Sequence, residues 1–106
     1  MASLYIQEFQ GVGYPQLQNS FIGAALSTAL LPSLSQPVLT ISGSPSLSNA
    51  FALTTILIRV HCDSICSIVV GGLNPVANTS SMRLAASQTE YFGVRAGEFL
   101  SVISNV

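Results

Sequence analysis

The stretch Leu53–Val70, LTTILIRVHCDSICSIVV, decides the fold, because it is the longest run in the chain that is rich in β-branched and apolar residues. Its side chains alternate. Ile58 and Val60 fall on one face of a strand, while Arg59 and His61 fall on the other. One face can therefore enter a core, and the other can meet solvent or a partner.

A polar pair, Asp63-Ser64, interrupts this stretch. Short polar side chains in such a pair can bond their own backbone, as they do in turns. We therefore predict a structural hairpin with its turn at this pair. If the turn is a two-residue loop, Cys66 pairs across with His61. Cys62 and Cys66 then lie on opposite faces, which argues against a disulfide between them.

Further segments have the composition or the period-two pattern of strands, namely Ser3–Gln10, Val38–Ser42, Ser81–Ala86, Thr89–Val94 and Phe99–Ile103. Turn residues separate them at close spacing, which is typical of an antiparallel β-sandwich or a jelly-roll-like barrel. We therefore predict one all-β domain, 1–106. It has N-terminal strands and linkers over 1–49 and a β core over 50–106.

The segment 19–31, NSFIGAALSTALL, is the one place where a helix is conceivable. Its alanines and leucines favour a short helix near 20–31, whereas Gly23 and the Ser-Thr pair weaken it and Pro32 ends it. The alternative is a loop and a strand that lie over neighbouring subunits. The sequence gives both interpretations similar support.

The composition indicates self-association. Charged residues are 7 % of the 106 residues, against about 25 % in typical proteins, and the formal net charge is -1. Copies of such a chain repel one another little, so we expect a homo-oligomer, a dimer or a trimer. The 3 basic residues are scattered arginines, which argues against nucleic-acid binding.

No targeting or membrane segment is visible in the sequence. Met1–Phe9 lacks a basic region followed by an apolar one, and the most apolar later segment, 21–34, is shorter than the ~20 residues of a span. We therefore expect no membrane contact and synthesis in a cytosol, where cysteines are thiols by default.

One cluster, His61, Cys62, Asp63 and Cys66, has the residue types of a catalytic or metal site. Adjacent strand residues point to opposite faces, so a Cys62 nucleophile would lack His61 as its base. The spacing does not match common zinc sites, and the glutamates come from separate segments. We therefore expect no enzyme activity, no catalytic residue, no metal and no cofactor.

The predicted subunit contacts are charged or aromatic residues at strand faces and turns. Neighbouring strand positions send Tyr91 and Phe92 to opposite sides, so at least one ring is a candidate for an exposed contact. Arg83 and Glu90 flank one turn and can form a surface ion pair. The full set of predicted contacts is Arg59, His61, Arg83, Glu90, Tyr91 and Arg95.

A recognisable pattern covers about half of the chain, and its residues are Arg59, Val60, His61, Asp63, Cys66, Ser67, Gly71, Pro75, Ala77, Arg83, Leu84, Ala86, Thr89, Glu90, Tyr91, Phe92, Val94, Gly97, Val102 and Ile103. The pattern resembles that of small structural proteins of tailed bacteriophages that are encoded among the head genes. These proteins often have Thr where this chain has Cys62, which speaks against a required two-cysteine site.

The resemblance implies a virion protein built on a β-sandwich or jelly-roll-like module, with capsid decoration or cementing as its task. It implies two partners, the major capsid protein and further copies of the chain. It also implies a place on the capsid exterior after synthesis in the host bacterial cytoplasm. The alternatives are a neck, tail or fibre component and, in a different class, a jelly-roll carbohydrate-binding module, which the absence of Trp disfavours.

Overall fold

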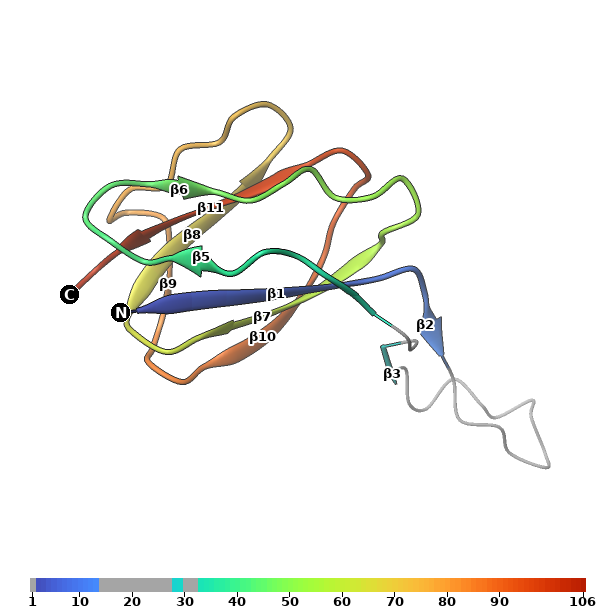
Figure 1. Ribbon diagram of the computed structural model, residues 1–106, viewed down its shortest axis with the longest axis horizontal. Helices are drawn as coiled ribbons and strands as arrows, with labels where there is room; N and C mark the ends of the chain where they lie inside the picture. The colour runs from blue at the N-terminus through green and yellow to red at the C-terminus, as the bar shows by residue number, and fades with distance from the viewer. Residues whose placement is uncertain (1, 14–27, 30–32) are drawn as a thin grey trace.

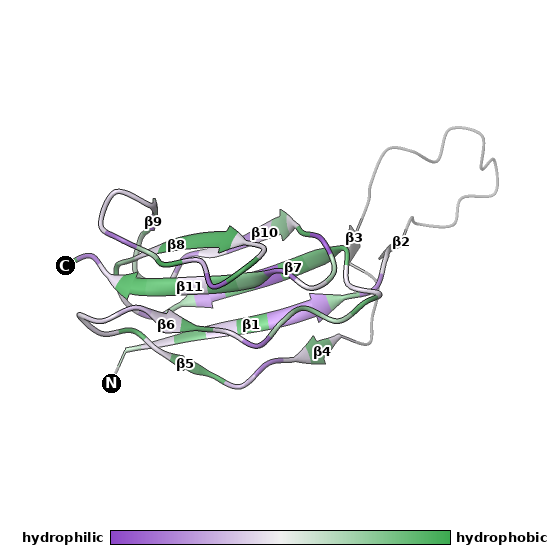
Figure 2. Ribbon diagram, turned by 90° about the horizontal axis from the view of Figure 1, so that it is seen from above, coloured by the Kyte–Doolittle hydropathy of each residue, from purple (hydrophilic) through white to green (hydrophobic). Residues whose placement is uncertain are grey.

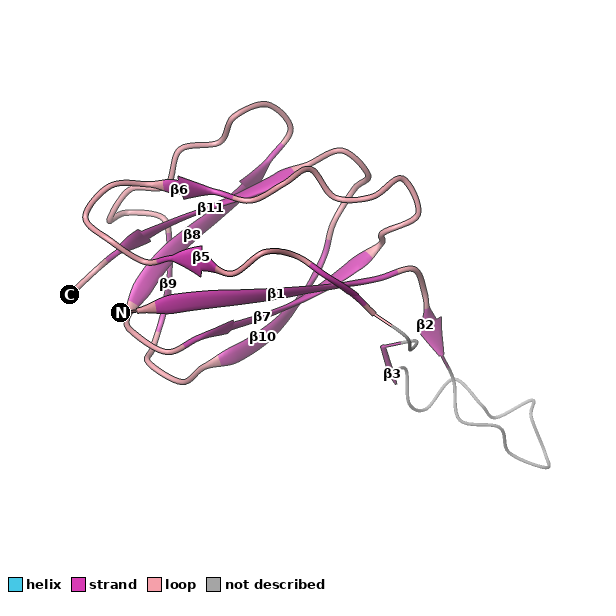
Figure 3. Cartoon of the chain, viewed as in Figure 1, coloured by secondary structure: helices cyan, strands magenta, loops and turns pink. Residues whose placement is uncertain are grey.

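Two antiparallel β-sheets pack face to face in the computed structural model, which describes residues 2–13, 28–29 and 33–106 (Figure 1). The strands are β1 (Ser3–Phe9), β2 (Val12–Gly13), β3 (Thr28–Ala29), β4 (Leu34–Ser35), β5 (Leu39–Thr40), β6 (Ser46–Leu47), β7 (Leu57–Cys62), β8 (Cys66–Gly71), β9 (Met82–Leu84), β10 (Thr89–Gly93) and β11 (Phe99–Ser104). The predicted all-β sandwich is confirmed, since the described residues form strands and loops but no helix (Figure 3).

The first sheet has the strand order β10-β7-β1-β4, with β5 also paired to β1. The second sheet has the order β6-β11-β8-β9, and β2 pairs with β3 apart from both. The segment near 20–31, for which a short helix and a loop with a strand had similar support, falls mostly outside the described residues. Of that range, Thr28–Ala29 are described, and they form a strand.

β7 and β8 are joined by an arch that crosses from one sheet to the other, so the predicted hairpin is wrong. β7 pairs with β1 and β10, whereas β8 pairs with β9 and β11. Alternation shows which face of a strand is apolar but not which strand lies beside it. The predicted faces are correct. Ile58 and Val60 are both 0 % exposed, while Arg59 and His61 are half-buried on the opposite face.

The core lies between the two sheets and draws on both halves of the chain. Its buried members are Leu4, Ile6, Ile41, Phe51, Ile58, Val60, Cys62, Cys66, Ile68, Leu84, Leu100 and Val102. β1 lies inside the first sheet, between β7 on one side and β4 and β5 on the other. The N-terminal strand therefore belongs to the core, which extends beyond the residues 50–106 to which we assigned it.

Glu8 is a buried carboxylate on the inner side of β1, with 6 % of its surface exposed. It accepts hydrogen bonds from Thr55 Oγ1 at 2.7 Å, from Ala52 N at 2.9 Å and from Gln36 Nε2 at 2.9 Å. The same Gln36 side chain binds both the backbone N and O of Asn49. Because a buried charge requires partners, this network fixes the connection after β4 and the connection before β7 against β1.

The outer face of the second sheet is covered by the loop between β8 and β9. Ser101 Oγ accepts a hydrogen bond from Ala77 N at 2.9 Å, and Ser67 Oγ accepts one from Asn105 Nδ2 at 2.7 Å. Both serines are buried. A sheet covered on both faces suits strands that are apolar along most of their length. Figure 2 shows the hydrophobic colour concentrated on β8 and β11.

Candidate binding face

The outer face of the first sheet carries aromatic and polar side chains, and we call it the tyrosine face. Its members alternate along β1, β7 and β10 with the core positions, and they are Tyr5, Gln7, Phe9, Leu57, Arg59, His61, Thr89 and Tyr91. Tyr5 is 41 % exposed and Tyr91 is 53 % exposed. The register places these side chains in rows that cross the three strands.

The first row consists of Tyr5, His61 and Thr89. His61 Nδ1 lies 2.7 Å from Thr89 Oγ1, and its ring centroid lies 6.3 Å from that of Tyr5 at an interplanar angle of 41°. Cross-strand neighbours of this kind stabilise a sheet and orient each other. The imidazole is therefore held between a hydroxyl on one side and an aromatic ring on the other.

The second row consists of Gln7, Arg59 and Tyr91. The Gln7 side-chain oxygen accepts hydrogen bonds from the hydroxyls of Ser33 at 2.8 Å and Ser35 at 2.9 Å. These bonds hold Gln7 in place at the β4 side of the face. Arg and Tyr are enriched at protein interfaces, because each combines a large contact area with a polar end.

Tyr91 also packs against Phe9, with ring centroids 6.4 Å apart and an interplanar angle of 39°. Phe9 is only 4 % exposed, so its buried ring provides a packing surface for Tyr91. The Tyr91 ring itself stays half-exposed to solvent. An aromatic pair in this tilted arrangement is favourable beyond its buried area. The tyrosine face therefore presents a preformed ring and not a freely moving one.

A hydroxyl that is hydrogen-bonded to an imidazole, as Thr89 is to His61, is also the starting arrangement of a nucleophile and its general base. Such a pair needs a third group to orient the base and donors for the developing oxyanion. Here the Tyr5 ring packs beside His61, and the pair lies on the outer face of the first sheet. This arrangement suits contact with a broad surface.

The structure brings together three of the six predicted contact residues, Arg59, His61 and Tyr91. Glu90 lies on the inner side of β10, and its carboxylate accepts a hydrogen bond from Gln88 Nε2 at 2.8 Å. Being on the inner side, it does not contribute to the tyrosine face.

Arg83 lies on β9 of the second sheet, opposite Ser67, and is exposed. It was expected to pair with Glu90 across one turn, but the two residues lie on strands of different sheets. Arg95 is exposed in the turn after β10, where its backbone N donates to Glu98 Oε1 at 2.8 Å. Arg83 and Arg95 are therefore separate from the tyrosine face.

Five members of the tyrosine face were not among the predicted contacts: Tyr5, Gln7, Phe9, Leu57 and Thr89. The period-two pattern of β1 places Tyr5 and Gln7 opposite the core positions, and that signal was available in the sequence. The pairing of β1 with β7 is a long-range contact that the pattern does not show. Without it, Tyr5 cannot be assigned to the face that carries His61.

The two cysteines lie in the core, and both are free thiols. We expected Cys62 and Cys66 on opposite faces of one hairpin; because β7 and β8 belong to different sheets, both instead point inward. Cys62 Sγ donates to Ala85 O at 3.0 Å. Burial raises the pKa of the Cys66 thiol to about 12, and Cys62 and Asp63 add to this rise. A thiol with so high a pKa is a poor nucleophile at neutral pH.

Within the described part of the chain, no group of three or more His, Cys, Asp or Glu side chains is placed to hold a metal ion. No helix among these residues is long and apolar enough to cross a membrane. Comparison of the chain with protein-family models, with curated proteins and with solved structures finds no match. The tyrosine face is therefore the candidate functional site among the described residues.

Proposed function

We propose that the protein is a structural component of a tailed-bacteriophage virion, and that it decorates and cements the capsid by binding the major capsid protein through the tyrosine face. The observation that carries the proposal is this preformed face, with two half-exposed tyrosines beside an arginine and a histidine. The resemblance of the C-terminal half to small phage head proteins supports the virion class.

The chemistry of the face fits a cementing role. Tyrosine rings supply large contact areas at low cost in conformational entropy, and their hydroxyls can bond to a partner's backbone. The low charge of the chain, 7 %, suits a surface that becomes buried, because interface cores are depleted in charged residues. A protein that binds the assembled shell but not free capsid subunits stabilises the shell by mass action.

The first experiment measures the copy number of the protein in purified virions by quantitative mass spectrometry. Decoration predicts a copy number comparable to that of the major capsid protein. A neck, tail or fibre component, the alternative within the virion class, predicts only a few copies. Virions that contain no copy would contradict both.

The second experiment tests the tyrosine face directly. Particles that lack the protein are mixed with the wild-type chain or with the double variant Tyr5→Ser, Tyr91→Ser, and the temperature of DNA release is measured. We expect the wild type to raise this temperature and the double variant not to. Leu73→Ser is the matched control, because Leu73 is 88 % exposed on the loop over the other sheet. A double variant that protects as well as the control would contradict the proposal.

One observation also favours a carbohydrate-binding module as a second candidate. Tyr5 and Tyr91 are half-exposed on the same flat sheet, and such rings can stack on sugars. The absence of Trp counts against this candidate. Binding of the isolated protein to a glycan array, lost in Tyr5→Ser, would favour it over capsid binding.

A further inference from the structure

β10 is an edge strand of the first sheet, and one side of its backbone is free. A hydrogen bond from Val94 N to Ile56 O at 3.0 Å and one from Cys62 N to Gln88 O at 3.2 Å set the alternation between β10 and β7. Even-numbered residues of β10 therefore direct their backbone groups toward β7, and odd-numbered residues direct theirs away.

The odd-numbered residues are Thr89, Tyr91 and Gly93, and among the described strands none pairs with this side of β10. β10 is 5 residues long, whereas β4, β5 and β6 have 2 and β9 has 3. Natural proteins protect sheet edges with very short strands, with Pro or with charged side chains, Lys above all. The sequence of β10, TEYFG, has neither Lys nor Pro, and its one charged residue, Glu90, already accepts a hydrogen bond from Gln88. It is thus the edge best suited to accept another strand.

We propose that two copies of the chain pair antiparallel along β10, about a twofold axis that passes between the two Tyr91 residues. In this register Tyr91 faces Tyr91 of the second copy, and Thr89 faces its Gly93. Each of these pairs can exchange two backbone hydrogen bonds, because their N–H and C=O groups all point outward. On the inner face of the sheet, the side chain of Glu90 lies opposite that of Phe92 of the second copy. The register therefore places no like charges directly opposite each other.

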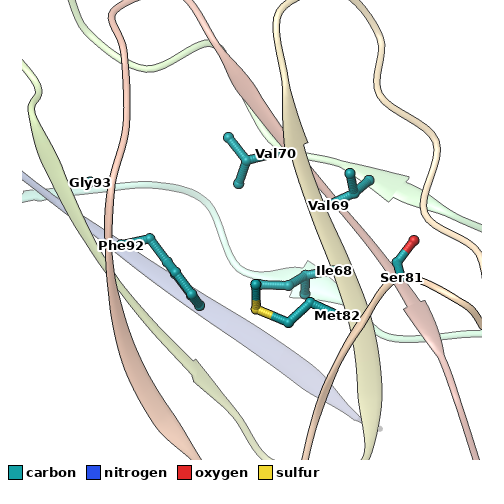
Figure 4. Close-up of a pocket in the computed structure, with 7 residues that line it drawn as sticks. All are labelled: Ile68, Val69, Val70, Ser81, Met82, Phe92 and Gly93. Carbon is teal, nitrogen blue, oxygen red and sulfur yellow. The ribbon is translucent and has the colours of Figure 1, made fainter.

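A groove next to β10 supports the same pairing. It has a volume of about 350 Å³ and lies between β10 of the first sheet and β8 and β9 of the second. Phe92 and Met82 face each other across it, with Ile68 beside them (Figure 4). Met82 is 54 % exposed. In the paired dimer, Phe92 lies diagonal to its symmetry mate, within reach of an aromatic side chain. The second copy then covers the open side of the groove.

The occupant is a second copy because the free edge is self-complementary. Thr89 and Gly93 are equally spaced from Tyr91, so one symmetric register satisfies both ends of the strand. The formal net charge of -1 opposes such a dimer only weakly. Edge pairing joins the two first sheets into one and leaves their tyrosine faces side by side. The inference stands independently of capsid binding.

The first test is sedimentation equilibrium of the full chain and of two variants at Gly93. Gly93→Pro removes an outward N–H from each copy without removing a hydrogen bond to β7. Loss of two bonds across the dimer should raise the dissociation constant roughly 30-fold. Gly93→Ala keeps the N–H, and its Cβ would meet only Ile56 O at 3.9 Å, so we expect no change. A monomeric wild type, or equal constants for the two variants, would overturn the proposal.

The second test follows individual amides of the wild type by hydrogen exchange, below and above the dissociation constant. We expect the amides of Thr89, Tyr91 and Gly93 to gain protection on association, while those that already bond to β7 stay protected throughout. Association that leaves the three amides unprotected would place the dimer interface elsewhere and overturn the proposal. This measurement needs no variant and does not depend on the folding of Gly93→Pro.

Discussion

The two outer faces of the sandwich differ in how far other parts of the chain cover them. On the second sheet, Ser67 and Ser101 are buried, and their hydroxyls accept hydrogen bonds that hold the C-terminus and the β8–β9 loop against the sheet. On the first sheet, Tyr5 and Tyr91 stay half in solvent above an ordered layer of side chains. One face is thus completed within the chain, and the other is available to a partner.

The sequences of the strands reflect this difference in coverage. β8, CSIVVG, is apolar along most of its length, whereas β7, LIRVHC, alternates between apolar residues and Arg59 or His61. A strand in a sheet with one open face keeps polar residues on that face, and a strand covered on both faces does not need them. The alternating strand therefore marks the face that can bind.

At neutral pH the largest effect is expected on the closed face. The double variant Ser67→Ala, Ser101→Ala removes two buried acceptors. It leaves the Ala77 N–H without its partner, while Asn105 Nδ2 keeps its bond to Thr79 O at 3.2 Å. We expect the free energy of unfolding to fall by about 3 kcal/mol, since the orphaned N–H costs ~1–3 kcal/mol and the lost bond to Asn105 ~1 kcal/mol. Urea unfolding measures it. The control is Tyr5→Ser, Tyr91→Ser on the open face. Equal losses for the two double variants would remove the distinction between the faces.

A second effect, which appears only at alkaline pH, is expected from the inner side that both sheets share. The folded chain holds the pKa of Cys66 at about 12, above its ordinary value of 9.0, chiefly through burial. Between these values the folded protein keeps a proton that the unfolded chain releases. Stability should therefore be unaffected by this group below pH 9 and fall as the pH rises toward about 12, by up to ~1.4 kcal/mol per pH unit.

Urea unfolding at a series of alkaline pH values tests this dependence. Cys66→Ala is the matched control, because it lacks the titrating thiol. Its stability should be lower at neutral pH, owing to the lost side-chain volume, but should fall less steeply above pH 9. Identical slopes in the two proteins would show that another group is responsible.

The smallest effect is expected on the open face itself. Thr89→Val removes the hydroxyl that lies 2.7 Å from His61 Nδ1 but keeps the shape of the side chain. Because the pair is only partly buried, water can replace the lost partner, and we expect a loss of about 0.5 kcal/mol. Thermal unfolding measures the change. A loss as large as that of the serine double variant would mean that His61 is a structural element of the core.

The sequence predicted the longer strands, their apolar faces and the position of Arg59 and His61 opposite Ile58 and Val60, because side-chain alternation is local. It did not predict the two-residue strands β2, β4 and β6, which are too short to show a pattern. It did not predict that β7 and β8 lie in different sheets, because a hairpin and an arch satisfy the same alternation. The error extended to Cys62 and Cys66, which were expected on opposite faces and both point into the core.

The candidate site was predicted in part for the same reason. Arg59 and His61 share a face of one strand, so they could be identified together. Tyr5 joins them only through the pairing of β1 with β7, which links residues far apart in the sequence. Alternation places Glu8 on the core face with Leu4 and Ile6, but the partners that satisfy its buried carboxylate, Thr55 and Ala52, come from a distant segment.

Hydroxyl-radical footprinting of the protein, free and bound to its particle, shows which face of the sandwich meets the partner. We expect that Tyr5 and Tyr91, both half-exposed in the free protein, lose most of their reactivity on binding, while the exposed Leu73 and Val76 on the loop over the second sheet keep theirs. The contrary result, protection of Leu73 and Val76 with reactive tyrosines, would show that the covered sheet faces the partner.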